Sequence, residues 1–198
     1  ELKRALLREL NFTLEARNMQ IVSQALSGEK DVIIPEVYED YTRFSVLTMD
    51  LIEGVKLKHL QPEDVEEREQ LAKIGIRLVV KQVLENGFFH ADPHPGNFLV
   101  VNEREVCLLD WGVVGLLPSE TRYELVELIG AIVDKEAEKV LDVLVALTEA
   151  NVTEINERLL LRDILEILHL YHSVTVGKLD LGQLLMDLNN MLRTNHIK

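Results

Sequence analysis

His90-Ala-Asp-Pro-His-Pro-Gly-Asn97, followed later by Leu109-Asp110-Trp111-Gly112, is the part of the sequence that decides the fold. The segment between these stretches has the pattern of two short strands, so a hairpin should return Asp110 to the side of Asn97. Asp92 and Asp110 would then converge with the Asn97 amide oxygen, which is a ligand set for Mg²⁺ carrying nucleotide phosphates. Because phosphoryl transfer requires positioning and charge neutralisation, the pattern predicts a metal-dependent phosphoryl-transfer site.

The spacing of these residues, an Asp followed by an Asn and then by an Asp-aromatic-Gly triplet, is the protein-kinase pattern. Three further segments agree: RELNFTLEARN at 8–18, VLTMDLIEG at 46–54 and LLPSETRYEL at 116–125. Together with HADPHPGN and LLDWG, they resemble the UbiB-like family of atypical kinases, whose members support isoprenoid quinone (coenzyme Q) biosynthesis. The resemblance covers about residues 1–150. It implies an α+β, protein-kinase-like fold, with a mainly helical large lobe and the remnant of a small sheet-bearing lobe.

The resemblance implies roles for three residues as catalytic groups. Asp92 would orient the phosphoryl acceptor or a water molecule and accept its proton. Asn97 and Asp110 would hold Mg²⁺ against the β- and γ-phosphates of ATP. The implied cofactors are therefore ATP and Mg²⁺.

Further residues would complete the nucleotide site. Glu15 would pair with a kinase-type lysine, and Glu9 would be the first acid of a Glu-x-Asp motif near the metal. Met49, Asp50 and Leu51 would border the adenine, chiefly through their backbone groups.

The chain departs from the family pattern at two places. Asn11 stands where the second acid of Glu-x-Asp is expected, so one negative charge is lost. The phosphate-contacting lysine and the segments around it would lie before Glu1, and Lys3 is in the same predicted helix as Glu15. We therefore expect a fragment that lacks most of the small lobe and hydrolyses ATP poorly, if at all, while the intact protein is an ATPase or phosphotransferase.

Hydrophobic periodicity predicts much helix and little sheet. We expect a small-lobe remnant over 1–55 and a helical large lobe over 56–198. The predicted strands are 31–38, 43–50, 98–101 and 106–109, and the predicted helices are 4–27, 63–85, 119–133, 135–149, 153–170 and 181–192. Ser or Thr before the later helices is expected as their N-cap.

Composition limits the possible partners. Lys plus Arg is 21 against 34 Asp plus Glu, a net charge of −13, which argues against binding nucleic acid or an anionic membrane surface. One cysteine, Cys107, excludes an intramolecular disulfide and a cysteine zinc cluster. No apolar run approaches the roughly 20 residues of a membrane span. The resemblance implies nucleotide and quinone-biosynthesis proteins or lipids as partners, in the cytoplasm or peripherally at a membrane.

Three other readings use the same residues. A small-molecule phosphotransferase of the aminoglycoside or choline kinase type has a similar His-x-Asp loop, and Trp111 after Asp110 favours it. A nucleotide-binding scaffold without chemistry is the second. The run His90-x-Asp92-x-His94 could also ligate a metal in a hydrolase, but the remaining histidines form no cluster to complete that site. His90 is expected to brace the loop.

Overall fold

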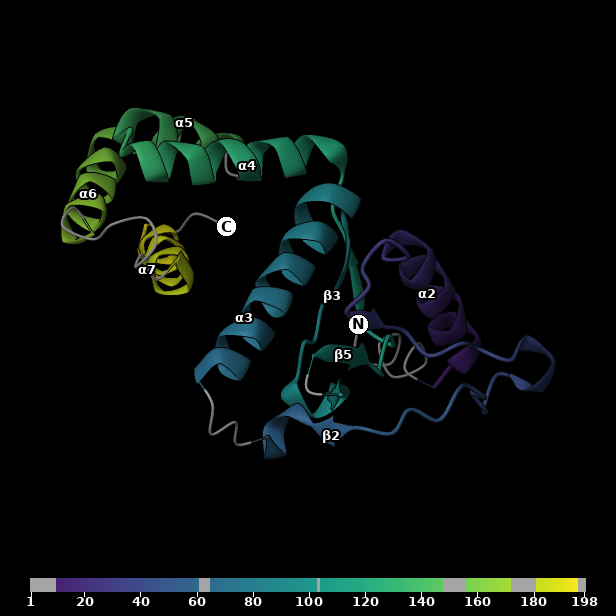
Figure 1. Cartoon of the computed structure of the whole chain (residues 1–198). Coiled ribbons are helices and arrows are strands. Elements are labelled where there is room, and N and C mark those ends of the chain that lie inside the picture. The colour runs from purple at the N-terminus through teal and green to yellow at the C-terminus, as the bar shows by residue number, and fades with distance from the viewer. Residues whose placement is uncertain (1–9, 61–64, 103, 148–155, 172–180, 196–198) are drawn as a thin grey trace. The chain divides into compact units, whose positions relative to one another are not determined.

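A computed structural model gives the positions of residues 10–60, 65–102, 104–147, 156–171 and 181–195, to which the description below is confined. The chain forms two units, Glu1–Leu117 and Pro118–Lys198, whose helices and strands are drawn in Figure 1. Each unit has its own hydrophobic core. The predicted boundary between the two lobes, at residue 55, does not coincide with the boundary between these two units, and it stays a prediction.

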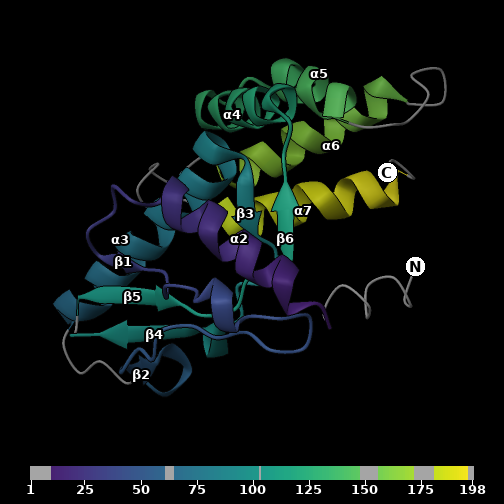
Figure 2. The same cartoon turned by 90° about the vertical axis from the view of Figure 1, so that its right-hand side faces the viewer.

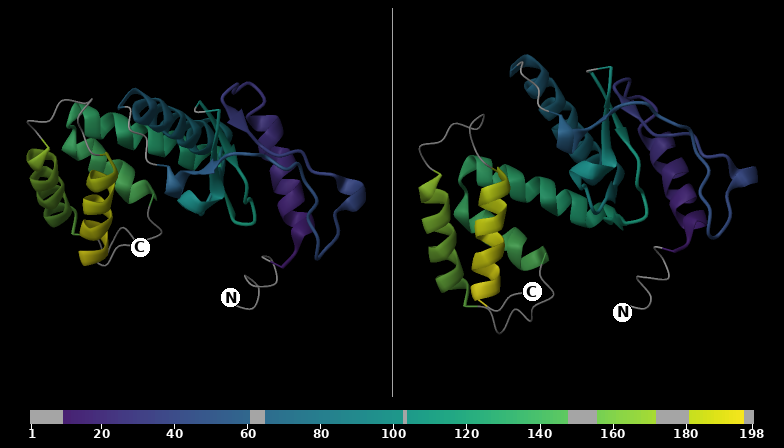
Figure 3. Two further views of the ribbon diagram at one scale, coloured as in Figure 1. Left: turned by 60° about the horizontal axis from the view of Figure 1, so that its bottom comes forward. Right: turned by 90° about the horizontal axis from the view of Figure 1, so that it is seen from below.

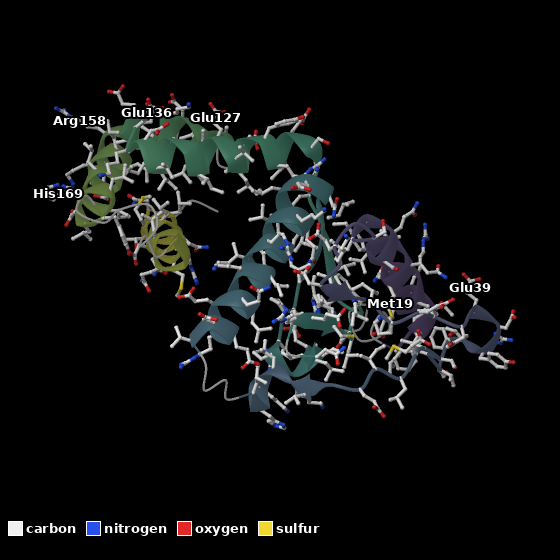
Figure 4. The ribbon with its side chains drawn as sticks, viewed as in Figure 1. Met19, Glu39, Glu127, Glu136, Arg158 and His169 are labelled. Carbon is white, nitrogen blue, oxygen red and sulfur yellow. The ribbon has the colours of Figure 1, made fainter. Side chains whose placement is uncertain are left out.

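Helix α2, Phe12–Ala25, begins the described part of the first unit. Residues 4–9 of the predicted helix lie outside the described residues. Asn11 is the N-cap, since its Oδ1 accepts the Thr13 backbone N–H at 3.2 Å. The buried residues Ala16, Met19 and Val22 recur every three positions, and Met19 lies on the inner side of the helix (Figure 4). Helix α2 therefore presents one apolar face to the core.

A small sheet has the strand order β1-β5-β4-β2 (Figure 2). The predicted hairpin forms its centre: β4, Phe98–Val101, and β5, Glu105–Leu108, are antiparallel, with Phe98 opposite Leu108. β1, Val32–Ile33, pairs parallel with β5, and β2, Val55–Lys56, pairs antiparallel with β4.

The two predicted strands before the long helix are largely absent. Of 31–38 only β1 joins the sheet, and 43–50 makes isolated bridges, Val37 to Met49 and Arg43 to Val46. A 3₁₀ turn, Glu39–Tyr41, lies between them. The alternation of apolar residues predicted extended strands. Each segment pairs with a neighbouring strand over too few residues to form a continuous β-ladder.

The long central helix is α3, Val65–Val80, which continues as a π-helical segment, Lys81–Asn86. The helix was predicted to end at residue 85, and the helical segment ends one residue later, at Asn86. The following residue, Gly87, has a left-handed φ of 68°, a conformation that glycine adopts without steric strain.

A second, two-stranded sheet was not predicted. β3, Phe88–His90, pairs antiparallel with β6, Val114–Leu116, and Phe89 lies opposite Gly115. A Cβ atom at residue 115 would overlap the Phe89 ring, so any other residue there would have to displace that ring.

The core of the first unit lies between α2, α3 and the hairpin. Its fully buried side chains include Met19, Ile74, Leu108 and Trp111. Cys107 on β5 is also fully buried, and burial raises the pKa of its thiol to about 12. Cys107 is therefore an inert apolar residue at neutral pH.

The second unit consists of the helices α4, Ser119–Asp134, α5, Ala137–Leu147, α6, Glu157–Leu170, and α7, Leu181–Thr194. α6 and α7 lie side by side (Figure 3). The predicted caps were wrong where they can be compared: Pro118, without a side-chain cap, precedes α4, and Asn156 caps α6 by accepting the Leu159 N–H at 3.2 Å. Thr153 lies outside the described residues.

The packing of α6 predicts very different effects for two neighbouring residues. Ile164 is 0% exposed in the core and Leu165 is 54% exposed. We expect Ile164→Ala to lower the free energy of unfolding by about 2–5 kcal/mol, because it leaves a cavity. Leu165→Ala, the matched control, should change it by less than about 0.5 kcal/mol. Urea unfolding followed by circular dichroism measures both, and equal effects would contradict the packing of α6.

Candidate active site

The pairing of β3 with β6 brings together the two ends of the candidate site. His90 lies opposite Val114, and the Ala91 N–H donates to the Val113 carbonyl at 3.1 Å. Asp92 lies two residues after the end of β3, and Asp110 lies four residues before the start of β6. The antiparallel pairing therefore places two carboxylates, eighteen residues apart in the sequence, at the same end of one small sheet.

The β4–β5 hairpin places Asn97 beside Asp110. The 3₁₀ turn Pro95–Asn97 leads into β4, and the Leu109 N–H donates to the Asn97 carbonyl at 2.9 Å. The Asn97 amide nitrogen donates to Asp110 Oδ2 at 3.3 Å. The structure therefore brings together two of the three residues predicted near the metal, Asn97 and Asp110.

The chemistry of this pair fits Mg²⁺. Among the described residues, no group of three or more His, Cys, Asp or Glu side chains is placed to hold a metal. A nucleotide-bound Mg²⁺ needs fewer protein ligands, because one or two protein oxygens, the phosphates and water complete its octahedron. A half-turn of the Asn97 amide would present its oxygen next to the Asp110 carboxylate. Ligation by Asn97 and Asp110 stays a prediction, as does that by Glu9, which lies outside the described residues.

Two hydrogen bonds hold the Asp110 carboxylate in a defined orientation. The Gly112 N–H donates to Asp110 Oδ1 at 2.9 Å, so each oxygen of this carboxylate accepts a hydrogen bond. A Cβ at residue 112 would lie 3.3 Å from that oxygen, which is closer than most real contacts. Glycine at 112 thus leaves room for the carboxylate.

Helix α2 contributes Glu15 to the site. Glu15 Oε1 accepts the Trp111 backbone N–H at 3.2 Å. Burial raises the pKa of Glu15, the Trp111 N–H lowers it, and the charge of Asp110 raises it further, with a net shift upward. The lysine expected to pair with Glu15 is not among the described residues, so that pairing stays a prediction.

His90 supports the loop that carries Asp92, as the sequence indicated. Its backbone N–H donates to Gln82 Oε1 at 2.9 Å, and its Nδ1 accepts the Asp92 N–H at 3.2 Å. Its ring lies 5.0 Å from the Trp111 ring and is stacked 6.2 Å from Phe98, measured between centroids. Burial lowers the pKa of His90 despite the charges of Asp110 and Asp92, so the imidazole is neutral at pH 7.

His94 has a local function in the loop. Its Nδ1 accepts the Gly96 N–H at 3.0 Å, which closes the turn before Asn97.

An open cavity of about 770 Å³ connects several predicted residues. Glu15, Met49, Asp92 and Asp110 all line it, and the remaining lining residues are Phe12, Ser45, Val46, Leu47, Leu109, Gly112 and Val113. Three carboxylates thus face a space large enough for a small-molecule ligand.

Asp50 and Leu51 do not line this cavity. Asp50 Oδ1 accepts the Tyr38 hydroxyl at 2.7 Å, and its backbone N–H donates to the Glu36 carbonyl at 2.9 Å. The Leu51 side chain is 89% exposed. A contact of these two residues with adenine stays a prediction.

Sequence reasoning missed two polar residues of the site. Asn18 donates from its amide nitrogen to the Trp111 carbonyl at 2.8 Å, and Gln82 holds the backbone of His90. The only signal for Asn18 was its position one helical turn after Glu15, on the same face of the helix.

In the part of the chain that the structure describes, no helix has the length and apolar character needed to cross a membrane.

Comparison with known proteins gives a family match and several relatives. The family model of the ABC1 atypical kinase-like domain matches residues 1–144. Protein ACTIVITY OF BC1 COMPLEX KINASE 3, chloroplastic, of Arabidopsis thaliana is 34% identical over 134 residues, covering 66% of this chain and 19% of the relative. The protein sll1770 of Synechocystis sp. is 35% identical over 150 residues, covering 74% of this chain and 26% of the relative. The chain therefore spans only about a fifth to a quarter of these relatives.

A solved structure shares the fold. It is the complex of Rv3197 with erythromycin from Mycobacterium tuberculosis, with a TM-score of 0.59 and 20% identity, covering 95% of this chain and 55% of that chain. The predicted α+β, protein-kinase-like fold is confirmed.

The environment of Glu15 predicts a pH dependence. Because its pKa is raised on folding, the folded chain binds a proton at higher pH than the unfolded chain does. Ionised Glu15 therefore lowers stability at neutral pH, and this penalty fades as the pH falls toward the raised pKa. Glu15→Gln keeps an oxygen for the Trp111 N–H and should remove this contribution. Urea unfolding at pH 7 and pH 5 should show a smaller gain of stability on acidification in Glu15→Gln, and an unchanged gain would contradict the assignment.

Proposed function

Because the chain belongs to the ABC1 atypical kinase-like family, we propose that the protein binds Mg-ATP and hydrolyses it or transfers its γ-phosphoryl group. The observation that supports this most is the convergence of Asp92 and Asp110 on one cavity, with Asn97 hydrogen-bonded to Asp110. These are the groups that phosphoryl transfer requires, and they come from both ends of the β4–β5 hairpin.

Each residue has a distinct role in this proposal. Asp110 and Asn97 would hold Mg²⁺, which supplies neutralisation of the charge on the phosphates. Asp92 would orient the acceptor hydroxyl or water and take its proton as the new P–O bond forms and the bond to the ADP oxygen breaks. Met49 lines the cavity and offers an apolar contact for the nucleotide.

The biological process in which we propose the protein acts is inferred from its family and not from the geometry of the site. We propose that the protein supports isoprenoid quinone (ubiquinone) biosynthesis, with proteins or lipids of that process as partners. The Arabidopsis relative is named for the activity of the BC1 complex.

A small-molecule phosphotransferase is the second candidate, because Trp111 follows Asp110 as in the aminoglycoside and choline kinases. Phosphate release from ATP should be measured with and without an aminoglycoside or choline. Stimulation by one of these acceptors favours the second candidate, and release without either favours the ATPase. Nucleotide binding without phosphate release would indicate a scaffold.

The metal role of Asp110 can be tested in the intact protein. Asp110→Asn should abolish Mg-dependent nucleotide binding, because a carboxylate ligand is replaced by a neutral amide. A thermal-shift titration with Mg-ATP measures this. Asp40→Asn, an exposed residue of the Glu39–Tyr41 turn, is the control and should bind like the parent. Unchanged Mg-ATP affinity of Asp110→Asn would refute the role.

Asp92 should affect turnover and not binding. Asp92→Asn keeps the size of the side chain but removes the proton acceptor, so we expect turnover to fall by at least about 10²-fold. Nucleotide affinity from the same titration should stay within about twofold of the parent. Near-normal turnover would make Asp92 a structural residue of the loop.

A further inference from the structure

Helix α2 holds both peptide groups that flank Trp111. Glu15 accepts the Trp111 N–H at 3.2 Å, and Asn18, one turn later, donates to the Trp111 carbonyl at 2.8 Å. Both side chains point to the same place because residues three apart share a helix face. The backbone on each side of the tryptophan is therefore bound to one rigid element.

The second of these bonds leads directly to the candidate metal ligand. The Trp111 carbonyl and the Gly112 N–H belong to the same planar peptide group, so they point in opposite directions. Asn18 binds the carbonyl, and the N–H donates to Asp110 Oδ1 at 2.9 Å. One rigid plane thus transmits the position of the Asn18 amide to the Asp110 carboxylate.

Packing of the Trp111 side chain already anchors the segment around residue 111, so the hydrogen bond from Asn18 has another role. The Trp111 side chain is fully buried between α2 and the core, and it packs against the His90 ring. The buried Trp111 ring does not prevent the Trp111–Gly112 peptide from rotating, because Gly112 has wide backbone freedom. A flipped peptide would present its carbonyl, and not its N–H, to Asp110.

We propose that Asn18 is a positioning residue, which fixes the Trp111–Gly112 peptide so that its N–H orients the Asp110 carboxylate toward Mg²⁺. This rests on the proposed function, since it assigns how the metal ligand of that site is oriented. Hydrogen bonds in such a series also polarise one another, so the Asn18 bond strengthens the bond at Asp110.

Two replacements of similar size distinguish the effect of losing the Asn18 hydrogen-bond donor from the effect of changing the side-chain volume. Asn18→Asp puts an acceptor against the carbonyl, and Asn18→Leu removes the donor without adding charge. Gln24→Leu makes the same polar-to-apolar change at an exposed position of α2 and serves as the control. If Asn18→Leu does not fold, Asn18→Asp carries the test alone, and thermal unfolding of each variant reports its stability.

The first measurement needs no nucleotide. NMR should show that the Gly112 amide exchanges with solvent at least about 3-fold faster in both Asn18 variants, the scale of one lost hydrogen bond, and at the parent rate in Gln24→Leu. An unchanged exchange rate at Gly112 would overturn the proposal.

The second measurement uses the intact protein and ATP. The Mg²⁺ concentration for half-maximal stimulation of ATP binding should rise about 3- to 10-fold in the Asn18 variants, while ATP affinity without metal stays within twofold. An equal loss of both affinities would make Asn18 merely structural and overturn the proposal. If the parent binds no Mg-ATP, the proposed function fails, and the Gly112 exchange rate still decides whether Asn18 orients the peptide.

Discussion

The antiparallel pairing of β3 with β6 is the constraint on which the site depends. These strands are three residues each, and between them the chain makes the loop, the β4–β5 hairpin and the Asp110 turn. Because both ends of this excursion are tied together, the loop after β3 and the turn before β6 must lie side by side. The hairpin adds the second condition, since its register returns Leu109 to Asn97. Two short ladders thus collect three polar residues from separate positions in the sequence.

The hairpin could be predicted because its signals are local. Two short apolar runs, 98–101 and 106–109, flank a polar turn, and Asn102 at that turn has the positive φ that asparagine tolerates. The convergence of Asn97 with Asp110 followed from the hairpin alone. The β3–β6 pairing could not be predicted in this way, because each strand is short and its partner lies more than twenty residues away. Gly115 appears as an unremarkable glycine until Phe89 is seen against it.

Other differences have the same origin in tertiary context. Residues 31–38 and 43–50 have the composition of strands, but most of their length finds no neighbouring strand, so bridges and a 3₁₀ turn form instead. Asn18 is a common helix residue, and only the position of the Trp111 backbone makes it part of the site. The placement of Asp92, Asn97 and Asp110 could therefore be predicted from spacing, whereas the side chains that support them depend on packing between elements.

Cys107 is the only sulfhydryl of the 198-residue chain, and it lies inside the core on β5 with its pKa raised to about 12. A maleimide dye at neutral pH therefore finds no native target while the chain is folded. A single cysteine introduced on the surface would become the sole point of attachment for a fluorophore or spin label. Pairs of such introduced cysteines would allow distance measurements within this chain without prior removal of Cys107.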